Sequence, residues 1–301
     1  MPNIIFIVGP TATGKTELAF RLAKSIKAQI ISCDSMAIYK EPQIITSKPT
    51  ERMLQEIPHH FVNIVSVEDT YSVFDYFTSA TKTIQDIFAR ICPVVVCGGS
   101  GLYAKTILDG IFDGVGADAS LRKDLEEKAR HYGKDYVHQE LKKVDPETAA
   151  KVNDVRRIIR ALEVYHITGL PMSKKKQQAK GLWSSLPIKI FGVHLTRENL
   201  YDRIHKRVDE MFEKGAVREV EGLLKLKLSL TAEKMIGIKE ISGYLKGEYN
   251  IEKARDEMKK ATRHFAKRQL TWFRADRRIE WLRADDLDTE HITERVLDSI
   301  K

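Results

Sequence analysis

Apolar residues form two kinds of pattern along the chain. Short runs rich in β-branched residues are typical of strands buried in a parallel sheet. Between them, apolar residues recur at intervals of three and four, which predicts helices. The runs that predict strands are residues 4–8, 28–33, 61–65, 93–97, 188–195 and 278–282. The helical patterns cover residues 15–25, 71–90, 198–214, 215–226, 238–245 and 251–273. This alternation predicts an α/β fold with a parallel sheet flanked by helices.

The pattern changes between residues 113 and 187, where strand signals disappear. Charged helical patterns take over at residues 119–132, 136–144 and 146–168, and residues 173–180 are predicted to be a basic loop. We therefore predict an α/β core of residues 1–112 and 188–301 and an all-helical insertion domain of residues 113–187. Within the core, residues 41–58 are predicted to be a polar loop because prolines interrupt them.

The first predicted strand runs directly into a sequence that fits G-x-x-x-x-G-K-[ST]. Such a turn points backbone N–H groups at an anion, at the positive end of the following helix. The lysine can reach a phosphate, and the final hydroxyl can hold Mg²⁺. The alternative is a chance glycine-rich turn, which the strand before it and the helix after it disfavour. The pattern therefore predicts a P-loop NTPase-like core that binds a di- or triphosphate, through Gly9, Pro10, Thr11, Ala12, Thr13, Gly14, Lys15 and Thr16.

Two more predicted strands end in sequences that can carry chemistry. Residues 28–33 lead into Asp34, and ligands of doubly wound sheets bind beyond the carboxyl ends of the strands. Asp34 is therefore expected to act on the group attached to the phosphates, the alternative being a helix or turn cap. Residues 93–97 lead into Gly98-Gly-Ser-Gly-Leu-Tyr103, a second flexible turn at the same edge. That strand ends without a carboxylate, which argues against an ordinary ATPase.

Composition places the chain among ordinary globular proteins. It has 301 residues, 43% of them hydrophobic and 31% charged, and no apolar run reaches the length of a membrane span. The three cysteines, Cys33, Cys92 and Cys97, lie in or beside apolar runs. We expect free thiols in a reducing cytoplasm rather than a disulfide or a zinc site.

The net charge of +8 is concentrated in two segments. Residues 151–180 hold eight basic residues against two acidic ones, and residues 255–278 hold nine against three. This concentration favours a polyanionic partner longer than a nucleotide, while two solvated helix faces remain the alternative. Arg203 and Arg207 lie four residues apart on one predicted helix face, where they either face the anion or pair with neighbouring acidic residues such as Asp209.

Taken in order, these motifs form a pattern that resembles one family. The blocks are Gly9–Thr16, Ile31-Ser-Cys-Asp-Ser-Met36, Ser47-Lys-Pro49, Pro58-His-His60, Tyr71-Ser-Val73, Gly98–Tyr103, Asn153–Glu163, Arg203–Met211 and Ala266-Lys-Arg-Gln-Leu-Thr-Trp-Phe273. Together they resemble the bacterial tRNA dimethylallyltransferases, also called tRNA isopentenylpyrophosphate transferases, from the first strand to about residue 276. Three positions depart from the usual pattern: Ala37 stands where the family has Gln, Ser100 where it has Thr, and Ile238 where it has Tyr.

The resemblance implies a prenyl transfer. Family members move the five-carbon group of dimethylallyl diphosphate to the exocyclic amino nitrogen (N6) of the adenine just 3′ of the anticodon, tRNA position 37. The tRNAs concerned read codons that begin with U, and diphosphate is released. Because that adenine is stacked in the anticodon loop, it must be flipped into the enzyme. The expected partners are dimethylallyl diphosphate and the tRNA anticodon stem-loop, the expected cofactor is Mg²⁺, and the chain is expected to act as a cytoplasmic monomer.

The same resemblance implies roles for individual residues. Lys15, Asp34 and Arg207 would be catalytic: Lys15 and Arg207 neutralise the leaving diphosphate, and Asp34 accepts a proton from the adenine amine. Arg203 joins the P-loop residues around the diphosphate, and Thr16 holds the metal. The residues expected to contact tRNA are Asp34, Ser35, Met36, Ala37, Ser100, Arg122, Arg156, Arg157 and Arg160.

Three other functions fit part of the sequence. A P-loop kinase for a small metabolite would use the glycine-rich loop and Asp34 but leave the insertion and the basic segments without a role. A prenyltransferase acting on free AMP would not need them either. A non-catalytic RNA-binding NTPase switch is disfavoured by the strand that ends without a carboxylate.

Overall fold

The computed structural model describes residues 3–112, 116, 118–285 and 288–300. The chain forms two compact units, one made of Met1–Ile107 and Trp183–Lys301 and the other of Leu108–Leu182. The predicted boundaries, after residues 112 and 187, each fall five residues beyond these divisions. No helix among the described residues combines the length and the apolar character that a membrane span requires.

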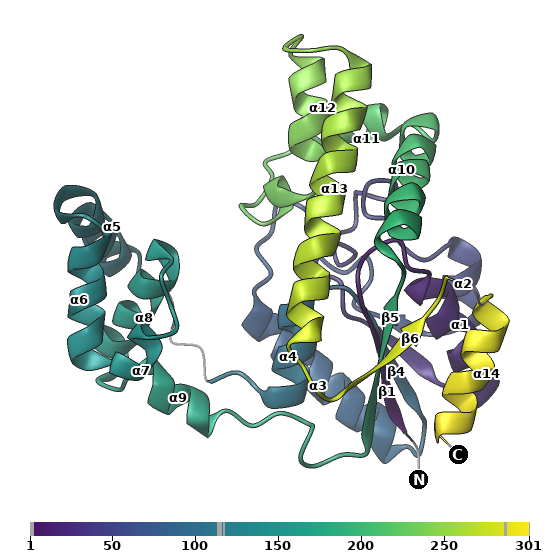
Figure 1. Ribbon diagram of the computed structural model, residues 1–301, viewed down its shortest axis with the longest axis horizontal. Coiled ribbons are helices and arrows are strands. Elements are labelled where there is room, and N and C mark those ends of the chain that lie inside the picture. Colours follow the sequence, from purple (N-terminus) through teal and green to yellow (C-terminus); the bar gives the residue numbers. More distant parts are fainter. Residues whose placement is uncertain (1–2, 113–115, 117, 286–287, 301) are drawn as a thin grey trace. The chain divides into compact units, whose positions relative to one another are not determined.

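The first unit is built on a parallel sheet of six strands (Figure 1). In chain order the strands are β1 (Ile4–Val8), β2 (Gln29–Ser32), β3 (His59–His60), β4 (Val94–Gly98), β5 (Ile188–His194) and β6 (Ile279–Arg283). Their spatial order is β3-β2-β4-β1-β5-β6, so β1 lies between β4 and β5. The register pairs Val8 with Gly98 on one side and with Gly192 on the other. The carboxyl ends of these strands therefore meet at one edge of the sheet.

Helices cover both faces of this sheet. Figure 1 shows α1 (Lys15–Ile26) and α14 (Thr289–Ile300) on one face, and α3 (Val73–Ala89) with α4 (Gly101–Asp109) on the other. The remaining helical elements of the unit are α2 (Glu51–Glu56), α10 (Arg197–Glu213), α11 (Ala216–Leu223), the 3₁₀ helix η1 (Ala232–Lys234), α12 (Ile238–Leu245) and α13 (Ile251–Arg274). The α/β architecture predicted from the sequence is confirmed.

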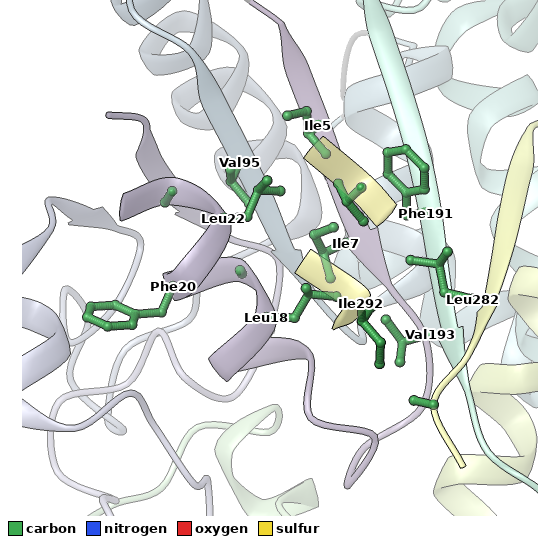
Figure 2. Close-up of a cluster of buried hydrophobic side chains, with 14 of the residues drawn as sticks. Ile5, Ile7, Leu18, Phe20, Leu22, Val95, Phe191, Val193, Leu282 and Ile292 are labelled. Carbon is green, nitrogen blue, oxygen red and sulfur yellow. The ribbon is translucent and has the colours of Figure 1, made fainter. Parts of the chain in front are cut away.

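The core under α1 shows why these residues form these elements. Ile5 and Ile7 project from one face of β1 because successive strand residues point to opposite faces. They pack against Leu18 and Leu22, which lie four residues apart on α1 (Figure 2). The apolar run of β1 is buried on both faces, as expected of a central parallel strand.

A second apolar cluster lies away from the sheet, among α10, α11, α12 and α13. Ile38, Tyr39 and Ile45, from the segment after β2, are buried in it together with Val220 of α11 and Met258 of α13. This cluster anchors the chain between β2 and α2 to helices that follow it by more than 150 residues.

The second unit, Leu108–Leu182, is helical among its described residues. It contains α5 (Ala119–Tyr132), α6 (Lys134–Val144), α7 (Pro146–Ala149), α8 (Val155–Thr168) and α9 (Met172–Gln178). Leu125, Leu141, Ile158 and Leu162 form its core. At its centre the fully buried carboxylate of Glu163 binds two arginines described below.

Two loops and one strand were predicted wrongly. Residues 61–65 do not form a strand, because Phe61 and Asn63 adopt left-handed φ angles of 63° and 57° that a strand excludes. Residues 41–58 are not all loop, because Thr50 caps α2, and prolines 49 and 58 flank that helix instead of interrupting it. Residues 173–180 are helical as far as Gln178, because the Asp145 carboxylate accepts a hydrogen bond from the Ser173 N–H at 2.9 Å near the start of α9.

Two helical predictions also need correction. The single helix predicted over residues 146–168 is broken into α7 and α8, since Asp154 starts a new helix by accepting a hydrogen bond from the Arg157 N–H at 3.1 Å. Helix α14 was not predicted, although Ile292 and Val296 have helical spacing and pack against the α1 side of the core.

The contribution of the buried Glu163 carboxylate to the stability of the second unit can be tested. It accepts hydrogen bonds from Arg122 at 2.8 Å, from Arg160 at 2.7 Å and from the Asp118 N–H at 3.0 Å. We expect Glu163→Ala to lower the free energy of unfolding by about 2 kcal/mol or more, because it leaves the Asp118 N–H and two partly buried guanidinium groups without their acceptor. Thermal and urea unfolding would measure the change. Glu127→Ala on the exposed face of α5 is the matched control, and an equal effect of the two changes would contradict the assignment.

Candidate functional site

The P-loop connects β1 to α1 through two glycines with positive φ angles. Gly9 has φ 137°, and a Cβ there would lie 2.4 Å from the carbonyl oxygen of Val193. Gly14 has φ 89° and caps α1 without a side-chain hydrogen bond. Inside the loop, Thr13 donates a hydrogen bond to the Pro10 carbonyl at 3.0 Å, and the Lys15 ammonium donates to the same oxygen. The loop is therefore folded around its own lysine.

Lys15 is a buried cation at the start of α1. Burial lowers its pKa from about 10.5 to about 8, and the neighbouring guanidinium of Arg207 lowers it as well, while the Asp34 carboxylate opposes the shift. A lysine buried in this way gains from a nearby anion, which would restore the pKa and stabilise the charged form.

Asp34 follows β2 at the same edge of the sheet. One of its carboxylate oxygens accepts a hydrogen bond from the Met36 N–H at 2.9 Å, so the alternative role of turn cap is real and uses that oxygen. The turn after β4 is bonded to this segment, because the Ser100 hydroxyl accepts from the Ser35 N–H at 2.9 Å. A Cβ on Gly98 would lie 2.0 Å from the Cys33 carbonyl oxygen. Glycine at 98 therefore permits the close approach of the two strands.

Gln269 of α13 ties two of these turns together, and it was not predicted as a site residue. Its side-chain oxygen accepts from the Thr11 N–H at 2.9 Å, and its amide donates to the Gly99 carbonyl at 2.9 Å. Only 6% of the residue is exposed. One sequence signal could have identified Gln269 as a site residue. It places an uncharged amide on the otherwise apolar side of a strongly basic helix, within the block of residues 266–273.

Arg207 of α10 lies beside the P-loop. Its Nε donates to the Ser47 hydroxyl at 2.9 Å, and burial lowers its pKa, against the opposing effect of the Asp34 carboxylate. The alternative pairing with Asp209 is wrong, because that carboxylate binds Lys259 at 2.8 Å and lies 3.5 Å from Arg255. Arg207 is therefore a half-buried cation that lines the site.

A cavity of about 520 Å³ collects most of the predicted site residues of the first unit. Those that line it are Thr11, Ala12, Gly14, Lys15, Thr16, Asp34, Met36, Ala37 and Arg207. Part of its wall is apolar and rich in methionine, a flexible and polarisable side chain, with Met36, Met53, Met211, Met235 and Met258. The cavity thus joins an anion-binding end to an apolar surface.

A second cavity, of about 580 Å³, shares Gly14 and Arg207 with the first. Its lining includes Arg203 and three further cations, Lys48, Lys206 and Lys214, but only one acidic residue, Glu210. Arg203 and Arg207 are thus brought together with the P-loop. Gly9, Pro10, Thr13, Ser35 and Ser100 support the site from the surrounding loops and line neither cavity.

The four arginines predicted to contact tRNA lie in the second unit. Arg122 and Arg160 share the Glu163 carboxylate, with 42% and 33% of their side chains exposed. Arg156 and Arg157, in the first turn of α8, are exposed. Two of the four are therefore held in place by a buried anion, and two project into solvent.

The donor atoms around the P-loop suit a magnesium ion bound through a diphosphate. Thr16, an exposed residue, lines the cavity of about 520 Å³, and Asp34 contributes a carboxylate to the same cavity. No group of three or more His, Cys, Asp or Glu residues in the described part of the chain could hold a metal by itself. Mg²⁺ commonly takes one or two protein oxygens and completes its shell with water and phosphate oxygens, so these residues fit it.

Comparison with known sequences identifies the family. The sequence profile of the IPP transferase family matches residues 37–276. This chain belongs to the IPP transferase family. A tRNA dimethylallyltransferase of Halothermothrix orenii is 44% identical over 285 residues, which cover 92% of this chain and 86% of the relative. Another, from Acetivibrio thermocellus, is 39% identical and covers 100% of this chain and 97% of the relative.

Solved structures of other members share the fold. The tRNA isopentenylpyrophosphate transferase of Bacillus halodurans is 34% identical with a TM-score of 0.74, and the match covers 100% of this chain and 96% of that one. A eukaryotic dimethylallyltransferase acting on tRNA is 28% identical with a TM-score of 0.85, and the match covers 100% of this chain and 80% of that one. The resemblance inferred from the motifs is confirmed, as is the P-loop-like α/β fold.

The buried lysine of this IPP transferase predicts a pH dependence of diphosphate binding. With a pKa of about 8 in the ligand-free protein, Lys15 is mostly charged at pH 7 and mostly neutral at pH 9. The affinity for dimethylallyl diphosphate, whose phosphates stay ionised over this range, should fall about tenfold between these pH values. Because binding favours the charged lysine, the complex should take up a proton at pH 8 to 9.

Calorimetry in buffers of different ionisation enthalpy would measure both effects. Lys48, also in the cavity wall, has a pKa of about 8 as well, so Lys48→Gln is the matched control. If the pH dependence disappears in this variant, Lys48 and not Lys15 is the titrating group.

Proposed function

We propose that this protein transfers the dimethylallyl group of dimethylallyl diphosphate to N6 of the adenine 3′-adjacent to the anticodon, tRNA position 37, and releases diphosphate. The acceptors would be tRNAs that read codons beginning with U. The observation that carries the proposal is one cavity that joins Lys15 of the P-loop, Arg207 of α10 and the Asp34 carboxylate to an apolar wall. The names of the relatives and the solved eukaryotic enzyme acting on tRNA support it.

The diphosphate end of the site would stabilise the leaving group. The P-loop N–H groups and α1 dipole favour an anion, buried Lys15 and half-buried Arg207 add two positive charges, and Arg203 lies in the adjoining cavity. As the bond between the allylic carbon and oxygen breaks, negative charge grows on the diphosphate and these groups neutralise it. Mg²⁺, held by Thr16 and the diphosphate oxygens, would add further charge neutralisation.

The apolar part of the cavity would protect the dimethylallyl group from water. The allylic carbon gains cationic character as it leaves the diphosphate, and water would capture it. Met211, Met235 and Met258 line the cavity and offer polarisable surface without a hydroxyl or amine that could compete as nucleophile.

Asp34 would complete the transfer as the base. The adenine N6 attacks the allylic carbon, a C–N bond forms, the C–O bond breaks, and N6 must lose one proton. Asp34 lines the cavity and its turn with Met36 orients the carboxylate, and both observations support its role as the acceptor of that proton. Met36 and Ala37 would contact the flipped base from the cavity wall, and Ser35 and Ser100, bonded to each other, would support that wall.

The remaining basic residues would hold the anticodon stem-loop by its phosphates. In the insertion, phosphates would be bound by the exposed Arg156 and Arg157 and by Arg122 and Arg160, which Glu163 holds in place. At the cavity wall, Arg268 would bind them. We propose that the enzyme acts in the cytoplasm, where tRNA is found, and as a monomer.

The decisive experiment is transfer of radiolabel from dimethylallyl diphosphate to an anticodon stem-loop with adenine 3′ of the anticodon, in the presence of Mg²⁺. We expect label on this RNA and none on a matched stem-loop with guanine at that position. Transfer to free AMP in preference to the stem-loop would overturn the choice of acceptor. Consumption of ATP with no labelled RNA would replace the proposal with a kinase.

The role of Asp34 is tested by Asp34→Ala. Removing the base should lower the turnover number by on the order of 10²-fold or more and leave stem-loop affinity nearly unchanged. Single-turnover transfer and filter binding would measure the two quantities. Asp69→Ala, at an exposed position of the same unit, is the control. Nearly normal turnover in Asp34→Ala would leave this residue with only its role in the turn.

The tRNA contact of the insertion is tested by reversing the charges of Arg156 and Arg157. The affinity for the stem-loop should fall, and the slope of log affinity against log salt should become shallower by about two, or about one per lost phosphate contact. Lys225→Glu with Lys227→Glu changes the net charge equally at exposed positions after α11 and is the control. An unchanged slope in the arginine variant would place both arginines on a merely solvated helix face.

A further inference from the structure

A single carboxylate binds the loop that faces Arg207. Glu219 of α11 accepts hydrogen bonds from three consecutive backbone N–H groups, those of Gln43 at 2.6 Å, Ile44 at 2.7 Å and Ile45 at 2.9 Å. Three donors on one ionised acceptor are a strong, charge-assisted anchor. The segment of residues 39–48, called the clamp loop below, therefore takes its shape from a residue more than 170 positions away.

The anchor is also packed in the core. Helix α11 buries Ala216, Val220 and Leu223 in the same apolar cluster that contains Ile38, just before the clamp loop, and Ile45 within it. The helix and the loop are thus packed together as well as hydrogen-bonded, so a displacement of Glu219 would displace the loop.

The clamp loop ends in a strained residue at the site. Ser47 has a left-handed φ of 48°, which a residue other than glycine adopts at a cost, and its N–H donates to the Ile44 carbonyl at 3.1 Å. Ser47 is also the residue whose hydroxyl accepts from Nε of Arg207. Such a conformation persists only when its surroundings hold it, and the Glu219 anchor lies two residues before it.

Lys48, the last residue of the clamp loop, binds the start of the loop. Its ammonium donates to the carbonyl oxygens of Tyr39 and Lys40, and its side chain lines both cavities. Glu219 and Glu41 are the carboxylates that favour its charged form against burial. The carboxylate of Glu219 therefore supports both loop residues that face the diphosphate end of the site.

We propose that Glu219 is a positioning residue that fixes the clamp loop, so that Ser47 holds the Arg207 guanidinium in its orientation toward the diphosphate. A long arginine side chain loses rotamer freedom when it binds an anion, and a neighbour that orients it beforehand removes part of that cost. This inference rests on the proposed function only in taking Arg207 to bind the diphosphate.

The test compares Glu219→Ala, Glu219→Gln and Glu221→Gln, the last at an exposed position of the same helix. Each variant is assayed for thermal stability, for binding of inorganic pyrophosphate with Mg²⁺ by calorimetry, and for stem-loop transfer. We expect Glu219→Ala to weaken pyrophosphate binding about tenfold and to raise the KM for dimethylallyl diphosphate more than that for the RNA. Glu219→Gln, which keeps one carbonyl oxygen as acceptor, should lose less, and Glu221→Gln should match the wild type.

A double-mutant cycle with Ser47→Ala shows whether the effect passes through the clamp loop. If it does, Ser47→Ala weakens pyrophosphate binding severalfold in the wild type and has little further effect in Glu219→Ala. Fully additive losses, or a lower melting temperature with unchanged affinity, would overturn the proposal and leave Glu219 a structural residue. If the wild-type protein transfers no label to RNA but Glu219→Ala still weakens pyrophosphate binding, the role of Glu219 is upheld and the proposed function is rejected.

Discussion

Four neighbouring parallel strands, β2, β4, β1 and β5, end at one edge of the sheet with their backbones in unusually close contact. A Cβ at Gly98 would lie 2.0 Å from the Cys33 carbonyl, and one at Gly9 would lie 2.4 Å from the Val193 carbonyl. These approaches bring the P-loop, Asp34 and the turn before Ser100 to the same place. Every other feature of the site is added around that junction.

The junction gathers positive charge before any substrate binds. Lys15 is buried and Arg207 is half-buried, and desolvation lowers the pKa of each. Desolvated cations are costly in the free protein and are stabilised when an anion arrives. This arrangement suits a reaction in which a diphosphate gains negative charge as it leaves, since the stabilising groups are in position before the bond breaks.

Helices distant in sequence hold the loops of this site in shape. Gln269 of α13 bonds the P-loop to the turn after β4, and Glu219 of α11 bonds the loop that carries Ser47. Loops placed by rigid elements in this way can carry precise chemistry without regular structure of their own. The helices of the second apolar cluster therefore serve the site as well as the core.

The sequence alone determined those elements that depend on residues close together in the chain. The apolar run of β1, the complete glycine-rich pattern and the strand–helix alternation predicted the sheet, the P-loop and the catalytic candidates Lys15, Asp34 and Arg207. The motifs also predicted the family. The apolar pattern predicted a strand wrongly where apolar residues are buried outside regular structure. Phe61, for example, is buried in a turn with positive φ.

Only the tertiary structure decided which groups meet. Gln269 and Glu219 act on loops that precede them by 170 residues or more, and nothing in the sequence around Thr11 or Ile44 indicates those partners. The family resemblance and the basic segment predicted a tRNA role for Arg160, but its partnership with buried Glu163 is visible only in the folded unit. The physical reason is that secondary structure follows from neighbours in the chain, whereas hydrogen bonds and charge burial depend on residues that only packing brings together.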